Sequence, residues 1–272
     1  MKELDIEDRK KLSFEGLLKF HEVMERHHLR YFLAWGTLLG AIRHKGFIPW
    51  DDDVDVDVWM PREDYNRMLA NADDFTMGDW SVMHNSINHD FLFTWASFIN
   101  KSIIRVPSPF VTDISIGFAI DVFPLDYVDM PLDSAKKVMF SESLKMDRII
   151  RRYHPSTYNR KFSAIEKLGR KALFNAMNII NKPYYEVISE YDNLFVKYND
   201  HSQSVGELMG TDKRVFSNEW FLESVNVEFE GKFFPAPKGY HEVLTTLYGD
   251  YMTPPPVEER ESLHDYRVFW ML

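Results

Sequence analysis

Hydrophobic and polar residues follow two different periods along the chain. Apolar residues recur every three or four positions through residues 5–27, which predicts an amphipathic opening helix. Short apolar and β-branched runs follow and alternate with helical patterns, which predicts strands separated by helices. The predicted elements are a strand at 31–35, a helix at 36–43, a helix from Pro61, and strands at 80–83, 91–99 and 118–123.

The second half of the chain has a different pattern. Residues 131–200 are predicted to be helical, with breaks near Pro155 and Pro183. A hairpin across Gly231 and a helix over 239–247 are then predicted. These elements together predict a mixed α/β (α+β) protein in three parts: a core sheet flanked by helices over 1–130, an inserted helical segment over 131–200, and a C-terminal hairpin and helix over 201–272 that pack back on the core.

A row of aspartates has strand alternation. From Asp53 the chain reads Asp-Val-Asp-Val-Asp, so in an extended strand the carboxylates lie on one face and the valines on the other. The acidic face holds Asp51, Asp53, Asp55 and Asp57, and the apolar face holds Val54, Val56 and Val58. Neighbouring carboxylates repel each other, and a hard divalent cation such as Mg²⁺ or Mn²⁺ neutralises them through oxygen ligands. The sequence therefore predicts a metal site.

Two other interpretations of the aspartate row are weaker. A solvated acidic surface does not explain valines on every alternate position. A calcium loop of the EF-hand type also begins Asp-x-Asp-x-Asp, but its sixth position needs glycine for a sharp turn, and that position is Val56.

Two aspartates lie in or next to a later apolar strand. Asp121 stands alone among apolar residues, and a charge there needs a partner, for which the same metal is the predicted one. Asp126 is predicted instead to end the strand and cap the following turn.

The residues before the aspartate row suit an anion. Gly36 and Thr37 turn the predicted strand into a helix, and backbone N–H groups at such a helix N-terminus bind phosphate well. Arg43, His44 and Lys45 follow directly and add cations. The segment therefore predicts a site for a polyphosphate held against the metal.

Composition limits the function classes. The chain has 272 residues, of which 45% are hydrophobic, so it can build a sizeable core. It has no cysteine, which excludes disulfides, thiolate metal sites and cysteine nucleophiles. A net charge of −10 argues against a nucleic-acid partner. The charged N-terminal residues and the lack of long apolar runs predict a cytoplasmic protein.

One segment departs from the acidic average. Residues 145–182 contain ten Lys or Arg and two acidic residues, in a pattern that predicts two amphipathic helices. Basic amphipathic helices can make a peripheral contact with an anionic membrane or bind a polyanionic acceptor. Ordinary packed helices with solvated basic faces explain the same pattern equally well.

Four motifs resemble the LicD family of phosphocholine transferases, which is related to the fukutin group. They are the run from Trp35 to Asp55 (Trp-Gly-Thr-Leu-Leu-Gly-Ala-Ile-Arg-His-Lys-Gly-Phe-Ile-Pro-Trp-Asp-Asp-Asp-Val-Asp), Met60–Tyr65, Ile120–Asp126 and Leu247–Met252. The resemblance implies a nucleotidyltransferase-type core over 1–130. Its centre would be the Gly36-Thr37 turn with Asp53, Asp55 and Asp121, while Asp57 lies outside the family pattern.

The activity that this resemblance implies is metal-dependent transfer of phosphocholine from CDP-choline to a hydroxyl of a cell-surface glycan precursor, such as teichoic acid, lipopolysaccharide or capsule, with release of CMP. Asp53, Asp55 and Asp121 would be the catalytic residues, and the metal would be held by these three with Asp51 as an outer ligand. Gly36, Thr37, Arg43, His44 and Lys45 would hold the diphosphate. An aromatic cage for choline has four candidates: Trp35, Trp50, Trp95 and Tyr251.

Three alternatives stay open at this point. A phosphotransferase that uses CDP-glycerol or CDP-ribitol would have the same motifs. A nucleotide-sugar glycosyltransferase would share the Asp-x-Asp metal motif, but several strands and helices usually precede the motif in that class, and here one helix and one strand do. A non-catalytic binding protein is disfavoured because all three central aspartates are present.

Overall fold

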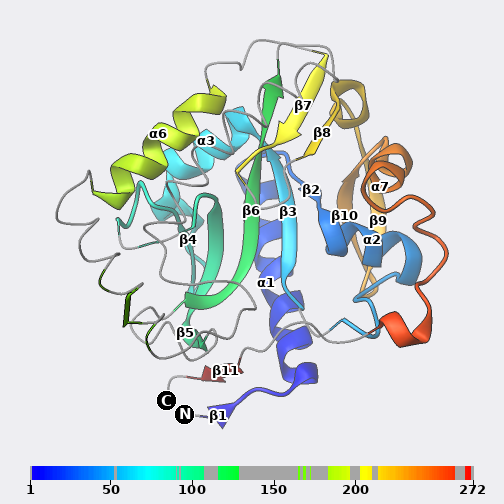
Figure 1. The fold of residues 1–272 in the computed structure, drawn as a ribbon, viewed down its shortest axis with the longest axis horizontal. Helices are drawn as coiled ribbons and strands as arrows, with labels where there is room; N and C mark the ends of the chain where they lie inside the picture. Colours follow the sequence, from blue (N-terminus) through cyan, green and yellow to red (C-terminus); the bar gives the residue numbers. More distant parts are fainter. Residues whose placement is uncertain are drawn as a thin grey trace.

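The structure, a computed structural model, describes residues 2–51, 54–89, 91, 93–106, 116–128, 165, 168–169, 172, 183–196, 203–209, 214–260 and 267–270. The strands of its main sheet are β1 (Lys2–Glu3), β2 (Phe32–Leu33), β3 (Val56–Pro61), β4 (Trp80–Met83), β5 (Ala96–Val106), β6 (Ile116–Val128), β7 (Ser204–Glu207), β8 (Arg214–Ser217) and β11 (Arg267–Trp270). Within the described residues this sheet has nine strands, in the order β1-β11-β5-β6-β3-β2, with β4 paired to β5 and the β7–β8 pair joined to β6 (Figure 1).

Strands β3 and β6 form a parallel pair, and the other strand pairs of the described sheet are antiparallel. The helices are α1 (Ile6–Arg26), α2 (Trp35–His44), α3 (Arg62–Ala70), α6 (Tyr184–Val196) and α7 (Tyr240–Tyr248). Asp5 caps α1, because its Oδ1 accepts a hydrogen bond of 2.8 Å from the Asp8 N–H. Helix α1 covers the apolar face of β3, β5 and β6, where Phe20 contacts Phe98.

The predicted mixed class of helices and sheet is confirmed, and so are the opening helix, the helices after residues 34 and 61, and the strand at 80–83. The predicted strand at 91–99 is wrong at its start, because β5 begins at Ala96. The Asn85 side-chain amide donates to the Phe91 carbonyl at 2.9 Å, and Thr94 Oγ1 donates to the Met209 carbonyl at 2.7 Å, so side-chain hydrogen bonds hold the chain here in place of a strand ladder.

Most of the predicted helical segment 131–200 lies outside the described residues, and so does most of the basic segment 145–182. In the described part, residues 165, 168–169 and 172 are helical, and α6 follows the break predicted at Pro183. None of the helices that the structure describes has the length and apolarity that a membrane span requires.

The predicted hairpin is confirmed as β9 (Ser224–Phe229) and β10 (Lys232–Pro237). Glu230 and Gly231 form its turn with φ values of 49° and 73°, as a two-residue type I′ turn requires. The Glu230 N–H donates to the Lys45 carbonyl at 2.8 Å, and the Phe47 N–H donates to Glu230 Oε1 at 3.1 Å. A Cβ atom at Gly46 would lie 2.2 Å from that same oxygen, so glycine allows this close approach. The hairpin is thereby fixed to the end of α2.

A buried ion cluster joins β6, α3 and α6. The guanidinium of Arg62 makes two hydrogen bonds to Asp126, Nε to Oδ1 at 2.7 Å and Nη2 to Oδ2 at 2.8 Å, and its Nη1 lies 2.8 Å from Asp192 Oδ1. The side chains of Arg62 and Asp126 are 4% and 0% exposed. Burial disfavours the charge, but the two carboxylates outweigh it and raise the pKa of Arg62 above its usual value. The prediction that Asp126 caps a turn is wrong, because Asp126 lies inside β6 as the partner of Arg62.

Replacing one partner of this cluster should destabilise the protein strongly. We expect Asp126→Asn to lower the free energy of unfolding by about 3–5 kcal/mol, because the variant leaves a buried guanidinium short of a counter-charge. Urea denaturation measures the change. Arg67→Met is the control, since Arg67 pairs with Asp64 but is 53% exposed, and its loss should cost less than about 1 kcal/mol. The triple variant Arg62→Met/Asp126→Leu/Asp192→Leu, which removes all three charges, should recover most of the loss, and no recovery would contradict the charge-based explanation.

His84 is a second buried titratable group near this cluster. The Ser86 N–H donates to His84 Nδ1 at 3.1 Å, which fixes the neutral ring with its proton on Nε2. Burial and the nearby Arg62 charge lower the pKa of His84 from 6.5 to about 4. The unfolded chain therefore takes up a proton near pH 6.5 that the folded protein takes up only near pH 4.

This pKa shift predicts a pH dependence of stability. Neutral His84 contributes at most about 3 kcal/mol to the free energy of unfolding. This contribution is complete above pH 6.5 and is lost as the pH falls toward 4. His84→Asn keeps an acceptor for Ser86 but cannot titrate, so its unfolding free energy should fall less than that of the wild type between pH 6.5 and 4.5. His28→Asn is the matched control, because His28 is exposed and its φ of 53° suits asparagine. Parallel pH curves for the wild type and His84→Asn would contradict the prediction.

Candidate active site

The parallel register of β3 and β6 sets Asp57 directly beside Asp121. On the other side of Asp121, Ser97 of β5 is its register partner, and Ser97 Oγ donates a hydrogen bond of 2.6 Å to Asp121 Oδ1. Neighbouring strands lie about 4.8 Å apart, so the three side chains form one polar row across the sheet. On the opposite face Val56 and Val58 are completely buried. The predicted alternation of aspartate and valine is therefore confirmed over residues 56–58 of β3, whereas Val54 precedes the strand and lines the cavity with the aspartates.

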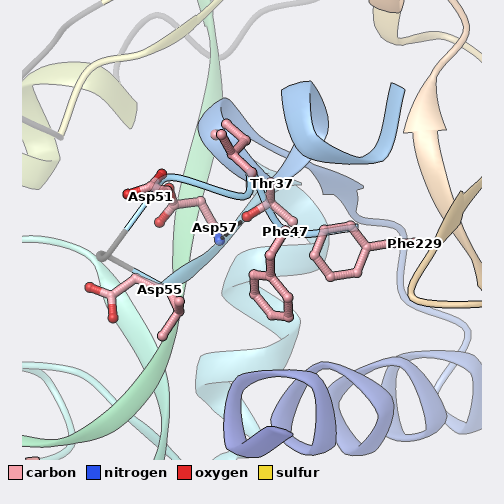
Figure 2. A pocket seen from close by; sticks show the side chains of 9 residues that line it. Thr37, Phe47, Asp51, Asp55, Asp57 and Phe229 are labelled. Atoms are coloured by element: carbon pink, nitrogen blue, oxygen red, sulfur yellow. Dashed lines mark hydrogen bonds between the residues drawn. The ribbon is translucent and has the colours of Figure 1, made fainter. Parts of the chain in front are cut away.

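A cavity of about 210 Å³ opens at the start of β3 (Figure 2). It is lined by Gly36, Thr37, Phe47, Ile48, Asp51, Val54, Asp55, Asp57 and Phe229. In Figure 2 the aspartates lie on one side of Thr37 and the rings of Phe47 and Phe229 on the other. Three of the nine lining residues are carboxylates and none is Lys, Arg or His, within the part of the chain that is described.

The first turn of α2 is fixed to β3 at this cavity. The Ala34 N–H donates to the Asp57 carbonyl at 2.9 Å, and the Asp57 N–H donates to Thr37 Oγ1 at 3.0 Å. Trp35 between them has a φ of 43°, a conformation that bulky residues rarely adopt. A Cβ atom at Gly36 would meet no atom within 4 Å, so the glycine leaves open space at the cavity wall. The turn that the sequence predicted as a phosphate site therefore does line the cavity.

The predicted metal ligands are partly brought together. Asp51 and Asp55 line the cavity with Asp57, and Asp121 lies next to Asp57, whose role the sequence left open. Asp53 lies outside the described residues, as does Asp52. Among the described residues no three His, Asp or Glu side chains are close enough together to hold a metal ion. The carboxylate oxygens are donors that suit a hard divalent ion, and the coordination itself stays a prediction.

The three basic residues that were predicted to bind the diphosphate lie in different surroundings. Lys45 Nζ lies 3.0 Å from Glu228 Oε2, so this lysine pairs with the hairpin. Arg43 and His44 instead contact the ring of Trp50, and Arg260 lies over the same ring. Burial, followed by the charges of Arg43 and Arg260, lowers the pKa of His44. Arg260 could not be predicted from the sequence as a member of this group, because it is more than 200 positions from Arg43.

The aromatic residues at the cavity also differ from the candidates for a choline cage. None of the four residues suggested from the sequence lines the cavity: Trp35, Trp50, Trp95 and Tyr251. Phe47 and Phe229 line it instead, with ring centroids 4.9 Å apart at an interplanar angle of 72°. Phe47 stands inside the motif run of the resemblance, whereas Phe229 reaches the cavity only because Glu230 ties the hairpin to α2.

Comparison with known proteins places this site in a family. The family model described as LicD/FKTN/FKRP, nucleotidyltransferase domain, matches residues 28–166, slightly more than half of the chain. The chain belongs to the LicD family. The matched residues contain α2, β3 and β6, which carry most of the cavity and the polar row, and the hairpin with Phe229 lies beyond them.

Relatives of the LicD family extend the match. The lipopolysaccharide cholinephosphotransferase LicD of Haemophilus influenzae is 31% identical over 269 residues, which cover 97% of each chain. Ribitol 5-phosphate transferase FKRP of mouse and of human is 50% identical over 38 residues, which cover 14% of this chain and 8% of that protein. The named relatives are thus phosphotransferases, and the family resemblance seen in the motifs is confirmed.

Ser97 should act as a positioning residue through Asp121. We expect Ser97→Ala to lower kcat by about 10-fold, because a hydrogen bond to a charged group is worth about 1.5–3 kcal/mol, while KM for the donor changes little. The measurement is steady-state transfer at varied donor concentration. Ser81→Ala is the matched control, since Ser81 is a buried serine of β4 whose hydroxyl has no hydrogen-bond partner in the described structure. Equal kcat values for the two variants would refute the role of Ser97.

Proposed function

We propose that this protein transfers phosphocholine from CDP-choline to a hydroxyl group of a cell-surface glycan such as lipopolysaccharide, with release of CMP. The observation that carries the proposal is a single cavity in which three aspartates face two phenylalanine rings. The cholinephosphotransferase relative, which matches over nearly its whole length, supports the same reaction.

The aromatic side of the cavity suits the choline head group. Quaternary ammonium ions bind to aromatic faces, and nearby carboxylates add electrostatic attraction. The cavity volume of about 210 Å³ is below the range of about 300–1,000 Å³ for drug-sized ligands, so it holds a head group and not a whole nucleotide. Phe47 is partly exposed and offers its ring to the cavity, whereas Phe229 is 1% exposed and packs edge-to-face against Phe47.

The acidic side of the cavity suits the reacting phosphate. Asp51, Asp55 and Asp121, with Asp57 beside them, would hold Mg²⁺ or Mn²⁺. Asp53 is included as a ligand from the sequence pattern alone. The bound ion would supply neutralisation of the phosphate charge, which phosphoryl transfer needs more than covalent help. The Gly36-Thr37 turn orients the phosphate through backbone N–H groups.

Asp121 has the role of a general base in this proposal. The acceptor hydroxyl oxygen attacks the phosphorus of phosphocholine, the bond from that phosphorus to the CMP oxygen breaks, and Asp121 takes the hydroxyl proton. Ser97 holds Oδ1 of Asp121 at 2.6 Å, which keeps the carboxylate in one orientation on the sheet.

A second candidate is transfer of ribitol phosphate from CDP-ribitol. The 38-residue match to ribitol 5-phosphate transferase favours it, since the short match is 50% identical. It ranks second because that match covers 14% of the chain, and because a polyol head group has no need of two aromatic rings.

A panel of donors tests the proposed function. The purified protein is incubated with Mg²⁺ and a hydroxyl acceptor, and CMP release from CDP-choline, CDP-ribitol and CDP-glycerol is measured beside nucleoside diphosphate release from UDP-sugars. We expect turnover with CDP-choline and none after chelation of the metal. Turnover with CDP-ribitol or CDP-glycerol alone would show that the transferred group is a polyol phosphate and not phosphocholine. Turnover with a UDP-sugar alone would indicate a glycosyltransferase.

A ring variant sharpens this test. Phe47→Ala should lower kcat/KM for CDP-choline by about 3- to 30-fold, since a cation–π contact is worth about 0.5–2 kcal/mol. Phe233→Ala is the control, because Phe233 is 62% exposed on β10 and does not line the cavity. An equal kcat/KM for both variants would refute the proposal that the cavity binds the choline head group.

A further inference from the structure

Two arginine side chains from distant parts of the chain meet on one tryptophan. The guanidinium carbon of Arg260 lies 4.3 Å from the ring centroid of Trp50, and that of Arg43 lies 5.5 Å from it. The ring of His44 stands edge-on to Trp50 at 5.3 Å and 90°. Cation–π attraction holds such guanidinium groups in place while leaving their N–H groups able to donate.

The hydrogen bonds of these two arginines go to neutral acceptors. Arg43 Nη1 donates to the Tyr251 carbonyl at 2.9 Å and Arg43 Nε to His44 Nε2 at 2.8 Å, while Arg260 Nε donates to the Pro255 carbonyl at 2.9 Å. No carboxylate of the described residues pairs with either guanidinium. Arg62 shows the contrast, since two carboxylates neutralise it.

The positive charges of the two arginines lie close enough together to affect each other. Burial and then the neighbouring charge of Arg260 lower the pKa of Arg43, although Tyr248 opposes this effect. Like charges this close repel each other, and a bound anion would remove the repulsion. Arginine is also the side chain best shaped to bind phosphate oxygens with two parallel N–H groups.

The chain connects the cluster directly to the cavity described above. Trp50 directly precedes Asp51, and the Asp51 N–H donates to the Ile48 carbonyl at 3.1 Å in a tight turn. Asp51 and Ile48 both line the cavity, and Arg43 lies on α2, whose first turn lines it too. Because the cavity is too small for a whole nucleotide donor, the rest of the donor must lie outside it, next to the cavity wall.

We propose that Arg260 and Arg43 form a phosphate clamp, supported by Trp50, which binds the diphosphate of the nucleotide donor at the edge of the cavity. This inference rests on the proposed function, since it takes the donor to be a nucleoside diphosphate compound. It adds Arg260, and with it the C-terminal segment 251–260, to the binding site. It also removes Trp50 from the candidates for choline binding, because two guanidinium groups on the ring repel a quaternary ammonium ion.

The clamp is tested with inorganic pyrophosphate and CDP-choline, each with Mg²⁺, by isothermal titration calorimetry on the full chain. Arg260→Gln should weaken the binding of both probes by about 10- to 100-fold, as the loss of a charge-assisted contact predicts. Arg260→Lys should recover part of the loss, because lysine keeps the positive charge but lacks the two parallel N–H donors of the guanidinium group. Arg26→Gln is the control, since Arg26 pairs with Glu22 on the exposed side of α1 and its removal should change neither affinity.

The outcomes separate this inference from the proposed function. If Arg260→Gln binds both probes as tightly as the wild type, the clamp is refuted even where CDP-choline turns over. If Arg260→Gln weakens pyrophosphate binding and CDP-choline gives no turnover with the wild type, the clamp is supported and CDP-choline is refuted as the donor. A loss in Arg260→Gln that lysine does not recover at all would assign Arg260 a structural role and overturn the clamp.

Discussion

The parallel pairing of β3 with β6 is the constraint on which the rest of the structure depends. A shift of one residue would turn every side chain of one strand to the other face. Two pairs of charged residues, one at each end of the paired strands, depend on this register. Asp57 lies beside Asp121 at one end, and Arg62 pairs with Asp126 at the other, with the same separation of 64 positions in the chain. The buried ion pair therefore fits only the register that also places the two aspartates together, about 16 Å away along the strands.

The two ends of this strand pair handle charge in opposite ways. At the Arg62 end the charges are neutralised inside the protein, and burial makes any mismatch costly, which favours a rigid structural role. At the Asp57 end the described lining of the cavity contains carboxylates and no cationic side chain. The rigid end thus fixes the geometry of the end that is proposed to bind the ligands, because both share the same two strands.

Local patterns in the sequence predicted the parts of the fold that depend on neighbouring residues. The alternation of aspartate and valine correctly placed the faces of β3, and the positive-φ turn at Gly231 fixed the hairpin. The sequence did not predict β1, β7, β8 or β11, because these strands have two to four residues and are defined by pairing with distant strands. The same holds for the cavity: its aspartates were predictable from spacing, whereas Phe229 is brought to it by the hydrogen bonds that join Glu230 to Lys45 and Phe47.

The distribution of charge around the cavity explains why such distant segments must meet there. A donor of the proposed kind carries a positive head group, a negative diphosphate and a bound cation within a few bond lengths. Carboxylates and aromatic rings suit the first and third, and guanidinium groups suit the second. In the proposed arrangement the carboxylates come from β3 and β6 and the outer guanidinium group comes from the C-terminal segment, so that one donor molecule contacts both.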